Sequence, residues 1–440
     1  MNNKRLMSTS LLAIGALLFA GCASSVTPSS SVPGSSVPTS TSEVPEEVSQ
    51  GVTDTTIKIG NTASQTGGYE IVGAPFNAGL KAALEEVNED GGIGGRTIEF
   101  ITYDDASNAS TGVAMTEKLV EEDEVFALVG HFGTWTVGPT VDYIQDVGIP
   151  MVYAATGINQ LYFERSPGNP VMAVQPIYKT EGRILLARVF SETDLFGTVD
   201  KVGVLYSSED AGLSIRAGIV SQAYDLGRVN DVVYQAGSGD YSAAVLALKT
   251  ANVDAVILAT NQGAIGGMIN AMAAGALNVP MLTSYVSANG YYIPDASVTP
   301  ERPLYVNAWV DITSEEVATE VEDYVATINA ASFLNETEKA LYGAGLNSFG
   351  IAGYIAGKIF IEGLNRMEAA GEVLNWENYI AVMESAPIDI PMGGSIDFTG
   401  GKRWGIDELA LIKYLNKAPE AYFGTFEVAK PVESLDEILA

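Results

Sequence analysis

The chain has 440 residues, and its 23 Lys and Arg are outnumbered by 54 Asp and Glu, for a net charge of −31. Nucleic-acid binding relies on clustered Lys and Arg, so this excess of acid argues against a phosphate-backbone partner. One Cys and one His exclude an intramolecular disulfide framework, a Cys-rich zinc site and the histidine pair of zinc proteases. The hydrophobic fraction of 47% with 18% charged residues is typical of a globular protein, and the length predicts two or three domains.

Residues 1–22 have the features of a bacterial secretion signal, in which a pair of basic residues precedes an apolar run from Leu11 to Ala20. The run is shorter than the roughly 18 residues that a membrane-spanning helix needs. It ends in Phe19-Ala20-Gly21-Cys22, which resembles a bacterial lipobox, although Leu is commoner where Phe19 stands. We therefore expect a diacylglyceryl thioether on Cys22, which would become the mature N-terminus. An ordinary signal peptide with an incidental cysteine is the alternative.

Residues 23–50 are predicted to be a disordered tether. They contain 13 Ser or Thr and 4 Pro, with almost no large side chains. Such a composition cannot bury enough apolar surface to offset the entropy of ordering. Only three acidic and two basic residues lie in the first 50 positions, so the negative charge belongs to the folded body.

The body alternates short apolar runs with amphipathic stretches, which predicts parallel β-sheets covered by helices. Ten or so strands are more than one such sheet usually holds, so we expect two lobes. Strands are predicted at 57–60, 97–103, 125–130, 149–153, 171–174, 202–206, 231–235, 254–260, 280–284 and 304–310, and helices at 72–90, 176–193, 211–227, 241–251, 263–276, 315–330 and 348–370.

Four features that could carry chemistry are better explained by structure. The glycines at 91–95 follow a helix and precede a strand, the reverse of a phosphate-binding loop, so they predict a turn. The run after Gly263 lacks the glycine spacing of a nucleotide site. His131 has no nucleophile elbow to serve, which favours a structural role. Asp104 and Asp105 point to opposite faces of a strand, and we expect them to cap the helix at 108–123.

Polar and aromatic residues follow the C-terminal ends of several predicted strands. Thr134 and Trp135 follow the third strand, residues 154–157 follow the fourth, and Asn261 and Gln262 follow a later one. Small ligands bind at that edge of open α/β sheets, and N–H groups and hydroxyls at a helix start can hold a carboxylate. The sequence therefore favours ligand binding without chemistry.

Several motifs follow one another in a particular order along the chain. They are IKIGNTASQTGG from Ile57, GGIGGR from Gly91, Ile98-Glu99-Phe100 leading to Tyr103-Asp104-Asp105, VGHFGTWT from Val129, Val147-Gly148-Ile149-Pro150 before Ala154-Ala155-Thr156, and Gly394-Ser395-Ile396-Asp397-Phe398. Each motif alone is weak, whereas their order is specific. This order resembles that of the leucine/isoleucine/valine-binding family of type I periplasmic binding proteins, and the resemblance covers about residues 54–430.

The resemblance implies two doubly wound α/β lobes that close on a ligand in the cleft between them. Three chain crossings would form the hinge, so each lobe is discontinuous in sequence. We expect crossings near 174–176, 307–310 and 391–394. The expected lobe I is 51–175 plus 310–392, and the expected lobe II is 176–309 plus 393–430.

The resemblance also implies a ligand site. By position, Thr134 matches the hydroxyl that receives the ligand carboxylate, and Ala154 and Thr156 match the contacts to the α-carboxylate and amino group. Trp135 would form an apolar wall. The predicted ligand-binding set is completed by Ala155, Tyr69, Asn261, Gln262 and Tyr285.

This sequence departs from the family pattern at the second half of the site. Where Asp-x-x-Tyr-Gly is common, the chain has Glu209-Asp210-Ala211-Gly212, so an aromatic wall is missing. Tyr285 stands near the position where amino-acid binders place a Glu for the ligand ammonium. Without that carboxylate an α-amino acid loses an anchor worth about 1.5–3 kcal/mol, unless Glu209 or Asp210 substitutes.

The expected function is that of a lipid-anchored, extracytoplasmic solute-binding protein of an ATP-driven importer. It would pass a branched-chain or other apolar amino acid, or a related carboxylate or amide, to a membrane permease. We expect no enzymatic activity, no cofactor, no metal and no nucleic-acid partner. A ligand sensor of the same fold that binds amides or urea is the alternative, and a surface hydrolase is less favoured.

Overall fold

The structure, a computed structural model, describes residues 47–418 and 424–440. The predicted secretion signal, Cys22 and most of the predicted tether lie outside the described residues. The last two residues of the predicted tether are hydrogen-bonded to the folded body. Ser49 N donates to Leu374 O at 3.0 Å, and Gln50 Nε2 donates to Val120 O at 2.9 Å and Val125 O at 3.1 Å.

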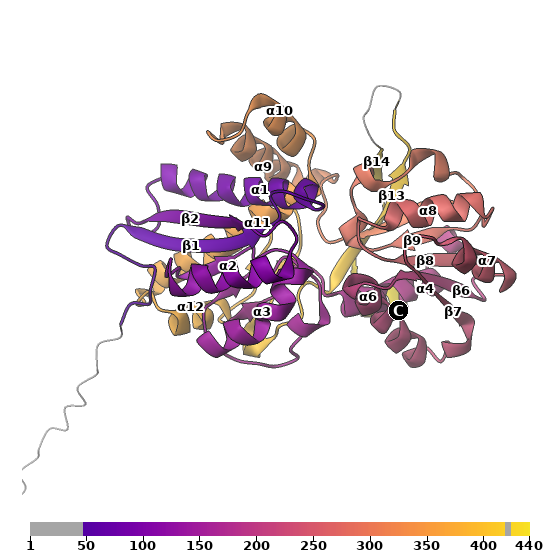
Figure 1. The fold of residues 1–440 in the computed structure, drawn as a ribbon, viewed down its shortest axis with the longest axis horizontal. Helices are drawn as coiled ribbons and strands as arrows, with labels where there is room; N and C mark the ends of the chain where they lie inside the picture. The colour runs from indigo at the N-terminus through magenta and orange to yellow at the C-terminus, as the bar shows by residue number, and fades with distance from the viewer. Residues whose placement is uncertain (1–46, 419–423) are drawn as a thin grey trace, which may run out of the picture. The chain divides into compact units, whose positions relative to one another are not determined.

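The first sheet has five parallel strands in the order β2-β1-β3-β4-β5 (Figure 1). Its central strands are almost entirely buried, as expected for a parallel sheet covered on both faces. The strands are β1 (Thr56–Ala63), β2 (Thr97–Asp104), β3 (Ala127–Val129), β4 (Met151–Val152) and β5 (Val171–Met172).

Helices α1 (Glu70–Glu89) and α11 (Ser348–Ala370) cover one face of this sheet, and α2 (Ala109–Glu121) and α3 (Thr134–Val147) cover the other (Figure 1). The contact between α1 and α11 is backbone to backbone. A Cβ atom placed on Gly79 would lie 1.9 Å from Gly350 O, and one on Gly353 would lie 1.8 Å from Phe76 O. Glycine is therefore required where the two helices cross.

The second sheet has seven strands in the order β14-β13-β10-β9-β8-β6-β7, parallel except for β13 and β14 at one edge. The strands are β6 (Val202–Ser207), β7 (Val232–Gly237), β8 (Ala255–Ala259), β9 (Met281–Thr283), β10 (Leu304–Ala308), β13 (Glu408–Leu415) and β14 (Thr425–Ser434), and the helices around them are α4 (Tyr178–Ser191), α6 (Asp210–Asp225), α7 (Ser242–Thr250) and α8 (Ile265–Ala274).

The two-sheet α/β architecture predicted from the sequence is confirmed, and each of the ten predicted strands is present. The glycines at 91–95 form the predicted turn between α1 and β2, in which Ile93 pairs with Arg96. The sequence reading missed short or edge elements. These are α5 (Thr193–Phe196), α10 (Glu336–Lys339), α12 (Trp376–Met383), β11 (Ile388–Asp389), β12 (Ser395–Ile396), β14 and α13 (Leu435–Leu439). Helix α9 (Ala318–Ala330) corresponds to the helix predicted at 315–330.

The hydrogen bonds around residues 391–406 place the third crossing later than expected. Gly393 pairs with Val310 beside the second crossing. The chain then stays with the first sheet's loops, because Ser166 N donates to Gly401 O at 2.7 Å. It reaches the first crossing where Ile406 N donates to Val174 O at 2.8 Å. We therefore propose that the third crossing lies at 405–406 and that the lobe boundary predicted at 393 moves there.

Among the described residues, no single helix has the length and apolarity needed to cross a membrane. The bent pair Glu336–Ala344 and Ser348–Ala370 passes that test only when taken together, with an angle of 84° between its parts.

Candidate functional site

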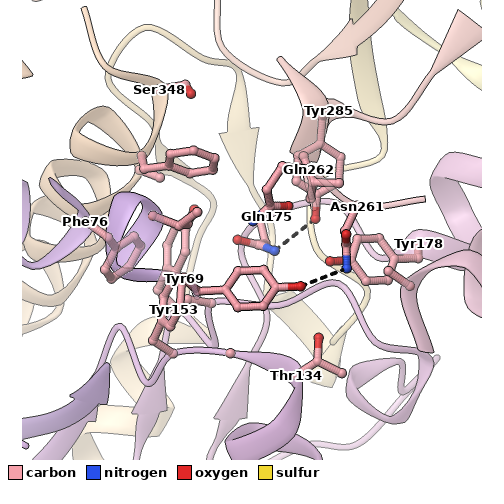
Figure 2. A pocket seen from close by; sticks show the side chains of 18 of the residues that line it. Tyr69, Phe76, Thr134, Tyr153, Gln175, Tyr178, Asn261, Gln262, Tyr285 and Ser348 are labelled. Atoms are coloured by element: carbon pink, nitrogen blue, oxygen red, sulfur yellow. Dashed lines mark hydrogen bonds between the residues drawn. The ribbon is translucent and has the colours of Figure 1, made fainter. Parts of the chain in front are cut away.

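One pocket lies where loops after strands of both sheets meet, and its empty volume, counted together with open solvent at its entrance, is about 740 Å³. Seven of the nine predicted ligand-binding residues line it (Figure 2), namely Tyr69, Thr134, Trp135, Ala155, Asn261, Gln262 and Tyr285. Two do not. Ala154 is fully buried below the surface of the pocket, and Thr156 is 2% exposed, although its hydroxyl lies 2.7 Å from that of Thr134.

Six aromatic rings form a continuous series along one side of the pocket, which we call the aromatic wall. Their centroids are separated by 4.7 Å (Tyr69 to Trp135), 6.0 Å (Trp135 to Phe132), 5.6 Å (Phe132 to Phe76), 5.7 Å (Phe76 to Tyr153) and 6.2 Å (Tyr153 to Trp309). Edge and tilted contacts at such distances add about 0.5–1.5 kcal/mol per pair to the energy of burial. The wall is therefore a packed apolar surface that is already formed.

Tyr153 occupies an unusual backbone conformation within this wall. Its φ of 57° lies in the left-handed region, which is costly for a bulky side chain. The hydrogen bond from Tyr153 N to Met172 O, 3.0 Å long, holds it at the end of β4. Strain of this kind gathers at functional sites.

Helix α3 begins at the pocket with its N–H groups available. Its N-cap is Gly133, which has no side chain to cap it, whereas Thr136 N and Val137 N donate to Gly133 O. The first N–H groups of a helix have no partner within the helix and favour anions. The start of α3 thus brings the N–H groups of Thr134 and Trp135 and the Thr134 hydroxyl to the pocket, and the hydroxyl of the buried Thr156 contacts that of Thr134.

Asp105 positions the start of α3. The expectation that it caps the helix predicted at 108–123 is therefore wrong. Its Oδ2 accepts from Trp135 Nε1 at 3.1 Å and from Thr136 Oγ1 at 2.7 Å. The N-cap of α2 is Asn108, whose side chain accepts from Thr111 N. Asp104 instead accepts from the main chain of Gln65 and Ala106. Both neighbouring carboxylates therefore accept hydrogen bonds from loops whose positions cannot be predicted from the sequence.

Tyr285 does not bring a carboxylate into the pocket, but it connects the pocket to the first crossing. Its hydroxyl donates to Pro176 O at 2.8 Å and lies 2.9 Å from the side-chain amide of Gln175. Figure 2 shows this contact beside the one between Tyr69 and Asn261. Burial raises the pKa of Tyr285, as it does those of Tyr69, Tyr153 and Tyr178, so these hydroxyls stay neutral.

Glu181 and Glu209 lie close behind the lining, and neither oxygen pair is free. Glu209 caps α6, accepting from Ala211 N at 2.9 Å, Gly212 N at 3.1 Å and Ser207 Oγ at 2.5 Å. Glu181 accepts from Ser284 Oγ at 2.6 Å, Tyr285 N at 2.8 Å and Asn307 Nδ2 at 3.4 Å. Burial raises the pKa of Glu181 to about 7. Glu209, which the sequence offered as a substitute anchor for a ligand ammonium group, is thus already engaged by main-chain N–H groups.

His131 is fully buried under the first sheet's edge, away from the pocket lining. Its ring nitrogens lie within 3.5 Å of the hydroxyls of Thr62, Thr116 and Thr140. Burial lowers its pKa to about 4, against the opposing charge of Asp105. A neutral, hydroxyl-bonded ring fits the structural role that the sequence favours. Within the described part of the chain, no group of three His, Cys, Asp or Glu residues could hold a metal ion.

A model of the family named periplasmic binding protein matches residues 56–417. The chain belongs to this family. The resemblance to type I periplasmic binding proteins of the leucine/isoleucine/valine-binding group is therefore confirmed, and with it the fold.

Relatives support this assignment at low identity. An "Amino acid binding protein" of Pseudomonas aeruginosa is 24% identical over 264 residues, which are 57% of this chain and 65% of that protein. "Leu/Ile/Val-binding protein homolog 1" of Brucella abortus is 29% identical over 47% of this chain and 55% of its own length. The chain thus spans between about half and two thirds of these relatives. A solved "Fatty acid ABC transporter substrate-binding protein from Thermomonospora curvata" has the same fold, with a TM-score of 0.71 and 20% identity over 88% of this chain and 95% of that one.

Sequence reasoning missed much of the apolar lining of this binding protein. Phe76 and Phe349 lie in amphipathic helices, and Tyr153 and Trp309 lie at strand ends. In the sequence, all four are indistinguishable from residues of the hydrophobic core. The left-handed backbone of Tyr153 leaves no sequence signal. The aromatic content of the segment from 129 to 153 is the only hint that the first sheet carries an apolar wall.

Proposed function

We propose that this protein is the substrate-binding lipoprotein of an ABC-type importer. It would capture a small solute between its lobes, a branched-chain or other apolar amino acid or a related carboxylate or amide, and deliver it to the permease without chemical change. The observation that carries this proposal is the uncapped start of α3, where the hydroxyl of Thr134 is paired with that of Thr156, beside the aromatic wall to which Trp135 belongs.

The start of α3 suits a carboxylate. Two N–H groups and the hydroxyl of Thr134 there can donate to its oxygens when Thr156 donates to Thr134, and the helix dipole adds to the attraction. Hydrogen bonds to a charged group contribute about 1.5–3 kcal/mol each. An anionic group can therefore be held by donors of this kind with no Lys or Arg beside it.

The aromatic wall suits the apolar part of the same solute. Rings of the wall come from helices and loops around the first sheet and from Trp309 after β10. The pocket residues Tyr178, Tyr285 and Ala211 come from the second sheet's elements. A solute that touches both sets is bound better by the closed arrangement than by an open one, which is the requirement for capture by closure.

The lipid anchor on Cys22 and the extracytoplasmic location belong to this proposal. A thiol at the end of a secretion signal would tie the binding protein to the membrane that holds its permease. The relatives named for amino-acid binding and for an ABC transporter support the same assignment. Metabolic labelling with a clickable fatty acid tests the anchor, since Cys22→Ser must abolish labelling.

Calorimetry against a panel of amino acids, monocarboxylates and amides tests capture. We expect at least one carboxylate to bind with a dissociation constant well below millimolar. Absence of any binding below millimolar concentration contradicts the proposal.

A sensor of amide- or urea-type ligands is the second candidate. It is favoured by the three side-chain amides, Gln175, Asn261 and Gln262, that line the pocket. Tighter binding of acetamide or urea than of any carboxylate, with a regulator gene rather than permease genes beside this one, would favour sensing.

A further inference from the structure

The pocket is electrically neutral apart from its helix dipole. The described residues that line it carry no charged side chain; nine are aromatic, and the polar ones are Thr134, Gln175, Asn261, Gln262 and Ser348. A charge on the solute must therefore be met by backbone groups, hydroxyls or amides.

Three carboxylates lie behind the lining of the pocket, and all three accept hydrogen bonds from other groups of the protein. Asp105 accepts from Trp135, Thr136, Ser64 and Ser107. Glu181 accepts from Ser284, Tyr285 and Asn307, and both oxygens of Glu209 accept from the start of α6 or from Ser207. Each acid stabilises a loop that shapes the pocket, and its oxygens face that loop.

An α-ammonium group is poorly served by such a pocket. It carries three N–H donors, and its removal from water is costly unless an acceptor of opposite charge compensates. The faces of the aromatic rings attract a cation, by about 0.5–2 kcal/mol, but they leave N–H donors without strong acceptors. Asn261 Oδ1 already accepts from Gly263 N at 2.9 Å. The carboxylate end of a solute is provided for, whereas its ammonium end is not.

We propose that the solute of this binding protein is a monocarboxylate with an apolar or aromatic body and no α-ammonium group. The inference rests on the proposed function and narrows its range of solutes. The carboxylate would lie at the start of α3 and the body against the aromatic wall. The chain would thus select deaminated relatives of the apolar amino acids.

Matched pairs of solutes test this selection on the full-length chain. Calorimetry compares leucine with 4-methylpentanoate, and phenylalanine with 3-phenylpropanoate, at one pH and ionic strength. Each pair shares its carboxylate and side chain and differs in the ammonium. We expect the deaminated member to bind at least tenfold more tightly in at least one pair.

The other outcomes separate this inference from the proposed function. Equal or tighter binding of the amino acids overturns the inference and leaves solute capture standing. Failure of both members of both pairs to bind at millimolar concentration overturns the inference and removes the support that the start of α3 gives to carboxylate capture.

A designed carboxylate gives a second, independent readout. Gln262 is half-buried at the pocket, so Gln262→Glu places an acceptor there at small structural cost. We expect the ratio of leucine affinity to 4-methylpentanoate affinity to rise at least tenfold. The exposed Gln160→Glu adds the same charge outside the lining and must leave the ratio within twofold. An unchanged ratio in folded Gln262→Glu contradicts the inference.

Discussion

The hydroxyl of Tyr69 lies 3.3 Å from Nδ2 of Asn261, although 192 positions separate the two residues. Tyr69 precedes α1, over the first sheet, and Asn261 follows β8 of the second. The bond thus joins loops of the two sheets at the pocket, which both residues line, and the Tyr69 ring lies against Trp135 with centroids 4.7 Å apart.

Replacing Tyr69 with Phe removes this bond and keeps the ring on Trp135. A neutral hydrogen bond contributes about 0.5–1.5 kcal/mol, so solute affinity should fall by about two- to tenfold. Calorimetry measures the affinity, and small-angle scattering should show a larger radius of gyration without solute. Tyr291→Phe, at an exposed side chain, is the control. An unchanged affinity and radius would show that the bond does not hold the closed form.

The double variant Thr134→Ala, Thr156→Ala removes the hydroxyl pair at the start of α3. We expect solute affinity to fall at least tenfold, because the hydrogen bond from the Thr134 hydroxyl to a carboxylate is lost together with the Thr156 hydroxyl that orients it. Thermal unfolding should change little in comparison. Serine at both positions restores the hydroxyls and should restore most of the binding; equal affinity in the alanine variant refutes the carboxylate site.

Trp135→Phe tests the buried Asp105. The substitution removes one donor from a carboxylate that is fully buried and leaves the aromatic ring in place. A hydrogen bond to a charged group contributes about 1.5–3 kcal/mol, and three donors to Asp105 remain, so urea denaturation should report a loss of about that size and no more. Trp404→Phe, at a partly exposed ring beside Tyr162, should lose much less. Equal losses would mean that Asp105 gains nothing from the indole.

Glu181 and His131 give stability opposite dependences on pH. The pKa of Glu181 rises from 4.5 to about 7 on folding, so its contribution is complete below pH 4.5 and is lost as pH rises through 7. The pKa of His131 falls from 6.5 to about 4, so its contribution is complete above pH 6.5 and is lost as pH falls towards 4.

Glu181→Gln should therefore remove the loss of stability between pH 5 and 7, a change on the order of 3 kcal/mol. The free energy of unfolding in urea, measured at intervals from pH 4.5 to 8, gives the slope. Glu372→Gln changes an exposed carboxylate and serves as the control. A slope in Glu181→Gln equal to that of the unmodified protein would contradict the assignment.

Gly353→Ala tests the crossing of α1 and α11. The added methyl group would lie 1.8 Å from a backbone oxygen, so the helices must separate, and we expect a loss of several kcal/mol. Gly68→Ala adds a methyl with open space around it and should be nearly neutral. Similar unfolding midpoints for the two variants would show that the helices give way easily.

The sequence predicts the repeating elements of this fold well and their irregular ends poorly. Buried strands such as β8 are uninterrupted apolar runs, which have few other interpretations. Edge strand β14 has no buried residue and has a Pro within it, so its pairing depends on β13 rather than on its own pattern. The third crossing that we propose at 405–406 lies later than the sequence predicts, because Gly393 pairs with Val310 and the chain after it is hydrogen-bonded to the first sheet's loops at Gly401.

The site shows the same division. Thr134 and Asn261 follow buried strands, and the rule that ligands gather at strand ends is enough to find them. Phe76, Tyr153 and Trp309 line the pocket from positions that look like core, because burial and ligand contact require the same apolar side chains. The engagement of Asp105 and Glu209 by neighbouring loops is set by tertiary contacts that no local pattern encodes.

Trp309 stands at the second crossing, 7% exposed, with its ring 6.2 Å from that of Tyr153. In the proposed function Trp309 belongs both to a hinge segment and to the surface that contacts the solute. Closure of the lobes, as proposed, would change the polarity around this indole even without solute. We therefore expect the fluorescence of a variant with Trp309 as its only tryptophan to report closure directly.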